Sequence, residues 1–329
     1  RALGHWFEQS PGSLTISFFG GEPLLDWALV RRSIERCSEL SESHKKKASF
    51  SIATNATRLS EEIYSVMAQV RMRVQVSVDG PADVHDRQRG RGTFEKVASA
   101  ISRLQGLPEV HLKTSTVVTP ENVDDLSRSL SFVWGLDAVE STLHFDLTAE
   151  WDEEHFDELK RQYVRLIPSA LDYHSRHAYF PHAEFQLMPE RMFPFKCDVG
   201  RRTMVLKPDG YVYGCNYHAP EWRGRALPER PPLALATLDE VLAHGLESEF
   251  VSRRFAEINR SPYQSPLEER YSDSRKCAEC PYLFRCGACQ ATAFSHDKDP
   301  RWLPESRCRV TELNYRYAKL LDRVLQEPE

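Results

Sequence analysis

The sequence predicts an α/β protein in which a larger domain built on a parallel sheet precedes a small cysteine-rich domain. Short β-prone runs alternate with helical patterns through the first half of the chain, which is typical of a parallel sheet, open or closed into a barrel. The 329 residues allow one large domain and a smaller one. Seven of the eight cysteines lie after residue 196, which marks the second domain chemically.

Five β-prone runs and the helical patterns between them make up the larger domain. The predicted strands are residues 14–19, 50–53, 74–78, 110–118 and 143–147. Apolar residues then recur at three- and four-residue steps, which predicts helices beginning near Trp27, Ser60, Thr93, Asn122 and Trp151, with Ser60 and Thr93 as caps. The polar segment 85–89 predicts a loop. Pro168 falls inside the last helical pattern, so we expect a kink or a break there.

The pattern changes near residue 180, and we place the domains at 1–180 and 181–329. Two β-prone runs, 204–206 and 211–213, flank a Lys-Pro-Asp-Gly turn and predict a hairpin. Residues 220–235 are rich in proline and arginine and predict a loop. Helices are then predicted at 237–245, 248–259 and 309–326, the last of them packed against the larger domain.

Charge and hydropathy exclude several classes of partner. The net charge of −5 and the pI near 6.2 give no electrostatic reason to expect nucleic acid or an anionic membrane. No apolar run approaches the roughly 18–20 residues that a membrane span needs. No signal peptide precedes the first predicted strand. We therefore expect a cytoplasmic protein with no nucleic-acid and no membrane partner.

Two glycines and a glutamate, Gly20, Gly21 and Glu22, follow the first predicted strand. Glycines let the backbone approach a ligand closely, and a glutamate accepts hydrogen bonds from an ammonium group. The carboxyl ends of parallel strands are where such folds bind ligands. Taken alone, however, this motif is more often a turn that uses Gly and Glu for its geometry.

Small polar residues also follow the second and third predicted strands, namely Thr54, Asn55, Ser77 and Asp79. Each of them alone would be a cap or a turn residue. Because parallel strands end at the same edge of a sheet, we expect all four to converge with the glycine turn. Together they predict one site for a nucleoside-like ligand.

The cysteines of the second domain form a spaced pattern. The first two, Cys197 and Cys215, are the ends of a C-x12-G-x4-C motif. Five more cysteines follow: Cys277, Cys280, Cys286, Cys289 and Cys308. Thiolates suit iron–sulfur clusters and zinc. Seven sulfurs supply three plus four for two clusters, whereas one structural zinc site would leave three unused. Spacing alone leaves both open. Disulfides are disfavoured by the odd count. Cys37, on an apolar helical stripe, is expected to be a buried core thiol.

Residues 18–25, 54–57, 77–81 and 85–87 together resemble the radical S-adenosylmethionine enzymes. The cysteine pattern resembles the SPASM domain, which carries two auxiliary [4Fe–4S] clusters in that family. The resemblance covers almost the whole chain. It implies a partial (β/α)6-type barrel, with its first strand apparently missing, followed by a small α+β SPASM-like iron–sulfur domain.

The resemblance also implies roles for the site residues. The methionyl amine of S-adenosylmethionine would be held by Gly20, Gly21 and Glu22. The ribose and carboxylate contacts of the family fall on Thr54, Asn55, Ser77 and Asp79. The first auxiliary cluster would be bound by Cys197, Cys215 and Cys289, and the second by Cys277, Cys280, Cys286 and Cys308. Catalytic side chains stay unassigned, while His85 and Asp86 are expected to order their loop.

Three departures from the family pattern matter. The family's C-x3-C-x2-C motif, whose thiolates bind the cluster that cleaves S-adenosylmethionine, does not occur in this sequence. The missing motif has two possible explanations: the sequence is a fragment of a longer protein, or the protein is a paralogue without radical chemistry. The start at a residue other than Met favours a fragment. A third cluster is expected only if the sequence is a fragment. Asn216 follows Cys215, where sulfatase-maturing members have Asp, which argues against sulfatase maturation. The spacing from Cys286 to Cys289 is one residue short, and the first cluster has no evident fourth ligand.

We therefore expect a radical S-adenosylmethionine maturase that modifies a ribosomal peptide or a protein side chain, by an oxidative crosslink or a similar reaction. Its expected partners are the peptide or protein substrate and an electron donor such as a flavodoxin or ferredoxin. One alternative is a non-catalytic, cluster-bearing scaffold or peptide-binding partner of an active maturase. Another is a zinc-stabilised binding protein.

Overall fold

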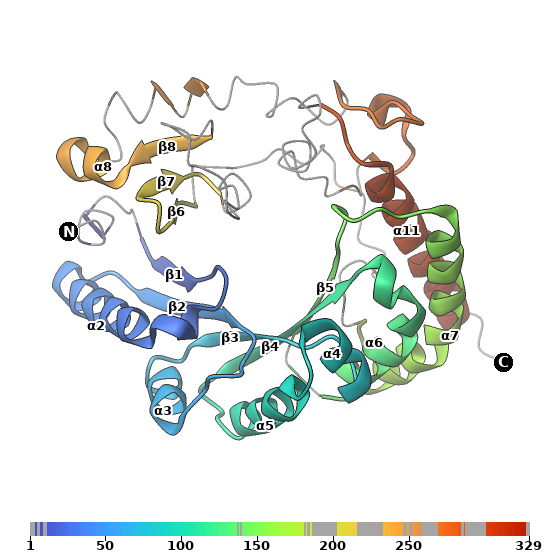
Figure 1. The fold of residues 1–329 in the computed structure, drawn as a ribbon, viewed down its shortest axis with the longest axis horizontal. Coiled ribbons are helices and arrows are strands. Elements are labelled where there is room, and N and C mark those ends of the chain that lie inside the picture. The colour runs from blue at the N-terminus through green and yellow to red at the C-terminus, as the bar shows by residue number, and fades with distance from the viewer. Residues whose placement is uncertain are drawn as a thin grey trace. The chain divides into compact units, whose positions relative to one another are not determined.

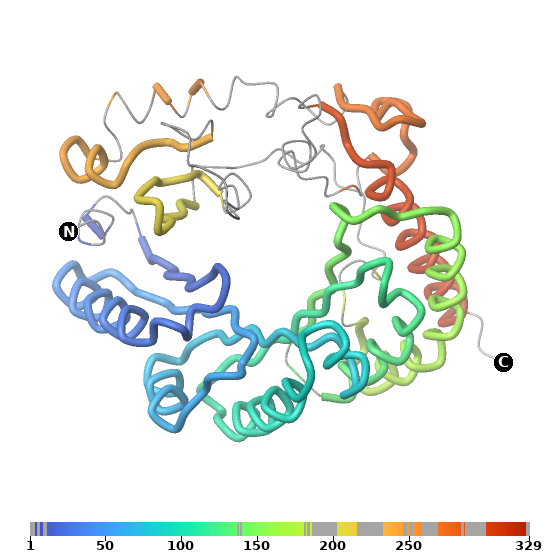
Figure 2. Tube along the Cα trace, viewed as in Figure 1, coloured from blue at the N-terminus to red at the C-terminus, as the bar shows by residue number. Residues whose placement is uncertain are grey.

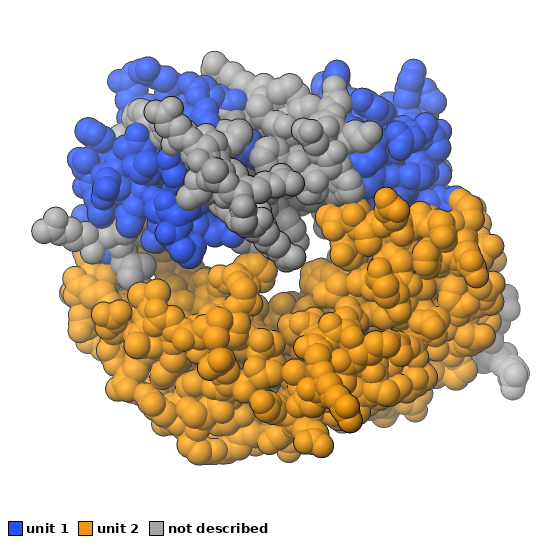
Figure 3. All heavy atoms as spheres, in the orientation of Figure 1, with its two compact units in different colours: residues 1–9, 189–312 blue, residues 10–188, 313–329 orange. Residues whose placement is uncertain are grey.

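The computed structural model describes most of the chain. The described residues are 4, 7–8, 12–136, 138, 140–180, 182, 185, 203–215, 233–245, 249, 253–254, 256–257, 269–283, 286 and 301–326. They fall into two compact units, coloured separately in Figure 3. The sheet unit is Ser10–Met188 with Leu313–Glu329, and the cysteine unit is Arg1–Gln9 with Pro189–Glu312.

A five-stranded parallel sheet forms the core of the sheet unit. Its strands are β1 (Leu14–Phe18), β2 (Ala48–Thr54), β3 (Arg73–Ser77), β4 (His111–Val118) and β5 (Glu140–Phe145), hydrogen-bonded in that order. All four neighbouring pairs are parallel. The trace therefore crosses the sheet from one edge to the other in chain order (Figure 2). The sheet is curved, and this confirms the predicted α/β fold with a partial barrel (Figure 1).

Helices cover the outer side of the curved sheet (Figure 1). They are α2 (Trp27–His44), α3 (Glu61–Gln69), α5 (Thr93–Gln105), α6 (Leu126–Trp134) and α7 (Glu153–His177), with short 3₁₀ turns η1 (Pro23–Asp26) and η2 (Pro120–Asp125) before α2 and α6. Alternate strand residues such as Phe50, Ile52 and Val76 are buried, which follows from the two-residue period of a strand. Ser60 caps α3 as predicted, accepting a hydrogen bond from the Ile63 N–H at 3.4 Å.

The opposite face of the sheet is polar. The hydroxyl groups of Ser17 on β1 and Ser51 on β2 are 2.6 Å apart and hydrogen-bonded. Lys113 on β4 forms an ion pair with Glu140 on β5 at 3.0 Å. Because these side chains alternate with the buried ones, the sheet presents hydrophilic groups on its inner side, where a barrel of this kind holds its ligands.

The prediction of a loop at residues 85–89 is wrong, because this segment lies in the helix α4 (Ala82–Arg89). Asp83 is in its first turn, while Arg87 and Arg89 are in its last, so the charges suit the helix dipole. Only Val84 and His85 are buried in it. So few apolar residues leave no hydrophobic periodicity, which is why the sequence pattern did not reveal the helix.

Pro168 does not break α7, contrary to one of the two outcomes expected for it. Proline removes the hydrogen bond that residue 168 would donate to the carbonyl of Val164. Val164 is 61% exposed, so water can satisfy that carbonyl on the solvent side.

The cysteine unit contains a small antiparallel sheet in the order β6 (Val205–Leu206), β7 (Tyr211–Tyr213), β8 (Ala234–Thr237). The predicted hairpin is β6–β7, and Gly210 with φ +80 forms its turn. The end of the predicted loop 220–235 instead belongs to β8, which precedes α8 (Leu238–His244). The predicted helix 248–259 lies largely outside the described residues.

The closing helix α11 (Glu305–Gln326) starts before the predicted residue 309, so Cys308 lies within it. Its later part packs against α7, as expected. The Tyr317 ring stacks on Tyr163 at 4.6 Å between centroids, and the Tyr163 hydroxyl donates a hydrogen bond to Asn314. Among the helices of the described segments, none combines the length and the apolar character that crossing a bilayer requires.

Candidate functional site

The carboxylate of Glu22 joins the glycine turn to the end of β2. Its Oε1 accepts hydrogen bonds from the Leu24 N–H at 3.0 Å and from the Thr54 hydroxyl at 2.8 Å. Its Oε2 accepts one from the Asn55 N–H at 2.7 Å. The structure therefore brings together three of the residues predicted at this edge of the sheet, and these contacts fix the position of a negative charge there.

Gly20 and Gly21 leave the turn before Glu22 open. Gly20 has φ +143, a region that favours glycine, and a Cβ added to either glycine would meet no atom within 4 Å. Both residues are exposed. The backbone of the turn is thus accessible to a ligand, beside a carboxylate that is already oriented.

The loop after β2 is held by its own side chains. Thr54 is 3% exposed, and its Oγ1 also accepts a hydrogen bond from the Ala56 N–H at 2.9 Å. Asn55 Oδ1 accepts from the Thr57 N–H at 3.0 Å and from the Thr57 hydroxyl at 2.7 Å. Thr54 and Asn55 therefore order this edge of the site, which reduces the conformational entropy lost when a ligand binds.

Ser77 and Asp79, at the end of β3, differ in their surroundings. Ser77 is half-buried, whereas Asp79 is fully buried. Both carboxylate oxygens of Asp79 bind the guanidinium of Arg89, and Oδ1 also accepts a hydrogen bond from the Val117 N–H at 3.0 Å. These contacts tie β3 to β4 and α4. They give Asp79 a role in the fold, and its predicted contact with a nucleoside stays a prediction.

Arg89 is the residue that the sequence analysis missed at this site. A carboxylate that follows a buried strand needs a cation if it is itself buried. The arginine-rich segment 87–91 could have indicated a cation for Asp79. Because residues 85–89 were predicted as a loop, the sequence did not indicate that α4 would hold Arg89 in a fixed position.

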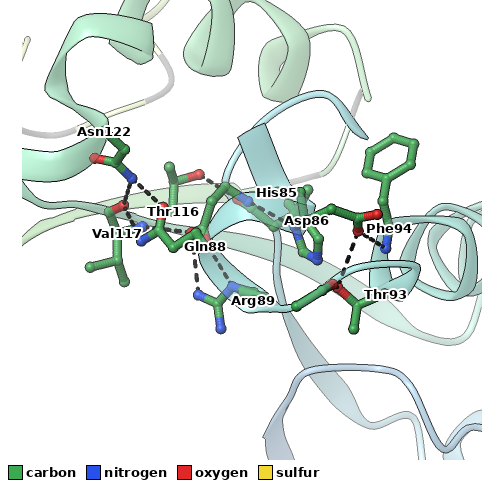
Figure 4. Close-up of polar contacts among 12 residues, drawn as sticks. His85, Asp86, Gln88, Arg89, Thr93, Phe94, Thr116, Val117 and Asn122 are labelled. Atoms are coloured by element: carbon green, nitrogen blue, oxygen red, sulfur yellow. Dashed lines mark hydrogen bonds and ion pairs between the residues drawn. The ribbon is translucent and has the colours of Figure 1, made fainter. Parts of the chain in front are cut away.

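His85 and Asp86, which were expected to order a loop, lie in α4 and contact the chain on either side of it (Figure 4). His85 is fully buried, its Nδ1 accepts a hydrogen bond from the Asp79 N–H at 3.3 Å, and its burial lowers its pKa. Asp86 accepts hydrogen bonds from the N–H groups of Gly92 at 2.6 Å and Phe94 at 2.8 Å. Asp86, rather than the predicted Thr93, thus supplies the side-chain cap at the start of α5.

We expect the change Asp86→Asn to make the stability of the protein less dependent on acidic pH. The Gly92 N–H, and then that of Phe94, hold the pKa of Asp86 below its usual value. A depressed pKa stabilises the folded state above the unfolded value of about 3.9, and the contribution is lost as pH falls through the folded pKa. Urea midpoints measured between pH 7 and pH 3 should therefore fall less steeply for the variant. Equal slopes would mean that Asp86 makes no charge-dependent contribution.

Four predicted cluster ligands gather in the cysteine unit. Cys277 packs with Leu283 and Leu303, and Cys286 packs against the same group. Cys280 and Cys308 act electrostatically on Cys277. None of the four is in a disulfide. The fold thus brings together thiols that are widely separated in the sequence, and this donor set fits a [4Fe–4S] cluster.

The surroundings of these thiols favour deprotonation only when a cation is present. Burial, and then the neighbouring Cys308, Cys286 and Cys280, raise the pKa of Cys277 to about 12. Burial likewise raises the pKa of Cys308 to about 11. Because metal binding releases the thiol protons, bound iron would supply the positive charge that offsets the burial and the mutual repulsion of the thiolates.

Within the described residues, no three side chains of His, Cys, Asp or Glu are arranged to hold a single metal ion. Each thiolate of a cubane cluster binds a different iron atom, so its ligands stand farther apart than those of one zinc ion.

The first predicted cluster is described only in part. Cys215 is half-buried and directly follows the hairpin, while Cys197 and Cys289 lie outside the described residues. Cys37 lies in α2 of the sheet unit, is fully buried, and has a pKa raised to about 11 by its burial. This confirms it as a core thiol.

The chain matches the model of the radical SAM superfamily over residues 5–133. The mycofactocin maturase MftC of Mycolicibacterium smegmatis is 27% identical over 210 residues, which cover 61% of this chain and 52% of that protein. An uncharacterized protein of Methanothermobacter thermautotrophicus is 32% identical over 122 residues, covering 35% of this chain and 45% of that one. The chain thus spans about half the length of the curated relatives it matches.

Solved structures share the fold over nearly the whole chain. The structure of anSMEcpe with bound AdoMet and the Kp18Cys peptide has a TM-score of 0.71 at 17% identity, covering 98% of this chain and 88% of that one. The structure of SuiB of Streptococcus suis bound to its precursor peptide SuiA has a TM-score of 0.54 at 14% identity. The match covers 94% of this chain and 69% of that one. Residues 5–133, which include β1 to β4, thus match the radical SAM superfamily, and the five parallel strands and the small antiparallel sheet of the described residues agree with the fold of these solved structures.

Proposed function

We propose that this protein is a radical S-adenosylmethionine maturase that modifies the side chain of a peptide or protein. The observation that carries the proposal is the fixed carboxylate of Glu22 beside an open glycine turn. The four gathered cysteines of the second unit support it. So do the relatives, since one is named a maturase and two of the solved structures hold peptides.

In this proposal the edge of the sheet binds S-adenosylmethionine. The carboxylate of Glu22, with the backbone of Gly20 and Gly21, would receive the methionyl ammonium group. Thr54 and Asn55 would hold that carboxylate in place while the ligand binds. Ser77, with its half-buried side chain at the end of β3, and Asp79 would serve the ribose and carboxylate end of the ligand.

The second unit would hold two auxiliary [4Fe–4S] clusters, and residues 1–180 and 181–329 would be the two functional domains. One cluster would be held by Cys277, Cys280, Cys286 and Cys308, and the other by Cys197, Cys215 and Cys289. When bound, such clusters supply one-electron chemistry to the reaction. A flavodoxin or ferredoxin would be the electron donor. The reduced thiols required for cluster binding fit a cytoplasmic location.

We expect Glu22→Gln to weaken the binding of S-adenosylmethionine by about tenfold or more, or about 1.4 kcal/mol. The amide keeps the size of the side chain but loses the charge that pairs with the ammonium group. Isothermal titration calorimetry of the purified protein measures this. Glu35→Gln is the matched control, because Glu35 lies on α2 with its side chain 56% exposed. Unchanged affinity in the Glu22 variant would remove this residue from the proposed site.

A reaction separates the enzyme from the cluster-bearing scaffold. The protein expressed from its complete reading frame, kept anaerobic and given a reductant with S-adenosylmethionine, should release 5′-deoxyadenosine. A scaffold or peptide-binding partner would hold iron and release none. Spectroscopy of the clusters in the same sample distinguishes an inactive scaffold from a preparation that has lost its iron.

A further inference from the structure

The side chain of Arg275 lies between a predicted cluster ligand and an acidic residue. Its Nη1 donates a hydrogen bond to the Sγ of Cys280 at 3.9 Å, and its Nη2 lies 3.5 Å from Oε2 of Glu312. The side chains of Arg275 and Glu312 are 27% and 18% exposed. A partly buried charged pair thus lies beside the Sγ of Cys280, with Arg275 as the member in contact with the sulfur.

Other groups complete the surroundings of the four thiols. The Thr311 hydroxyl donates to the Sγ of Cys286 at 4.0 Å. Arg270 is 2% exposed and acts electrostatically on Cys277, while Glu305 acts on Cys308. Arg275 contacts a sulfur atom through an N–H group, which places its positive charge directly at the proposed cluster site.

Reduction adds one negative charge to an iron–sulfur cluster and its thiolates. A neighbouring cation that donates a hydrogen bond to a thiolate stabilises the reduced form more than the oxidised form, so it raises the reduction potential. A neighbouring carboxylate acts in the opposite direction. Both effects are strong where water is largely excluded, because the effective dielectric constant is then low.

We propose that Arg275 and Glu312 set, in opposite directions, the reduction potential of the cluster held by Cys277, Cys280, Cys286 and Cys308. The inference rests on the proposed function, since it requires iron at these cysteines. Arg275 raises the potential through its charge and its N–H contact with Cys280. Glu312 holds the guanidinium in place and lowers the potential by its own charge.

Potentiometric titration followed by electron paramagnetic resonance tests this on the anaerobic, cluster-loaded protein. The signal of this cluster is identified as the one that Cys308→Ala removes. Arg275→Gln should make its potential more negative, changing the ratio of oxidised to reduced cluster at a fixed potential by about tenfold, which equals about 59 mV for one electron. Glu312→Gln should shift it in the positive direction. Arg253→Gln is the control, because Arg253 forms an exposed pair with Glu249 elsewhere in the unit.

The outcomes separate the inference from the function on which it rests. If Cys308→Ala removes neither iron nor a signal, the proposed cluster site is wrong. If the cluster is present but both variants leave its potential unchanged, or shift it in the same direction, the role of the pair is wrong. Should Arg275→Gln lose the cluster, Glu312→Gln decides, because a positive shift supports the proposal and an unchanged potential overturns it.

Discussion

Replacing Cys308 with alanine is expected to remove about four of about eight iron atoms per chain, because one of two proposed clusters loses a ligand. Cys308 is 8% exposed and lies in α11, close enough to Cys286 for the two thiols to interact electrostatically. Iron analysis and cluster spectra of the anaerobically purified variant measure the loss. The effect should be this large because Cys308 is the one proposed ligand of this cluster that α11 supplies, so the variant loses the attachment of the cluster to that helix.

Cys37→Ala is the matched control for this experiment. Cys37 is also a buried thiol, but it packs in α2 of the sheet unit, so its loss should lower stability and leave the iron content unchanged. Equal iron in wild type and Cys308→Ala would contradict the assignment of Cys308 as a ligand. Loss of all iron in both variants would show that the iron content depends on the general stability of the protein.

Asp79→Ala is expected to destabilise the sheet unit by about 3–5 kcal/mol, because it leaves Arg89 without its partner in a largely buried pair. The carboxylate of Asp79 is fully buried, while the side chain of Arg89 is 26% exposed. The change also removes the acceptor of the Val117 N–H, which lies 3.0 Å from it. Urea unfolding followed by circular dichroism measures the effect.

Asp83→Ala provides the comparison for that variant. Asp83 pairs with Arg128 on the surface, with side chains 60% and 54% exposed, so solvent screens the interaction and little stability should be lost. If Asp79→Ala unfolded at the same urea concentration as Asp83→Ala, the pair of Asp79 with Arg89 would have no special role in holding β3, β4 and α4 together.

Much of the sheet unit could be predicted from local patterns. Runs such as 14–19 and 74–78 are apolar and β-prone, and strands of this kind followed by amphipathic helices have few alternatives to a parallel sheet. The helix α4 could not be predicted this way, because its stability comes from contacts of His85 and Arg89 with Asp79 rather than from an apolar stripe. The same holds for β8, which is a strand because β7 pairs with it.

The candidate site was predicted as a set of residues but not as a network. The position of Glu22 after a strand indicated a ligand at the edge of the sheet. Its use of Thr54 and Asn55 as hydrogen-bond donors depends on the register between β1 and β2, which sequence spacing does not specify. Arg275 was missed for a similar reason, since only the folded chain places it beside Cys280 and Glu312.

The metal content and absorbance spectrum of the anaerobically purified protein test the central claim most directly, that the chain is an iron–sulfur protein of the radical SAM type. We expect a brown protein with broad absorbance near 400 nm, about eight iron atoms per chain from the two auxiliary clusters, and no stoichiometric zinc. A colourless protein that holds zinc at its cysteines and contains no iron would contradict the account.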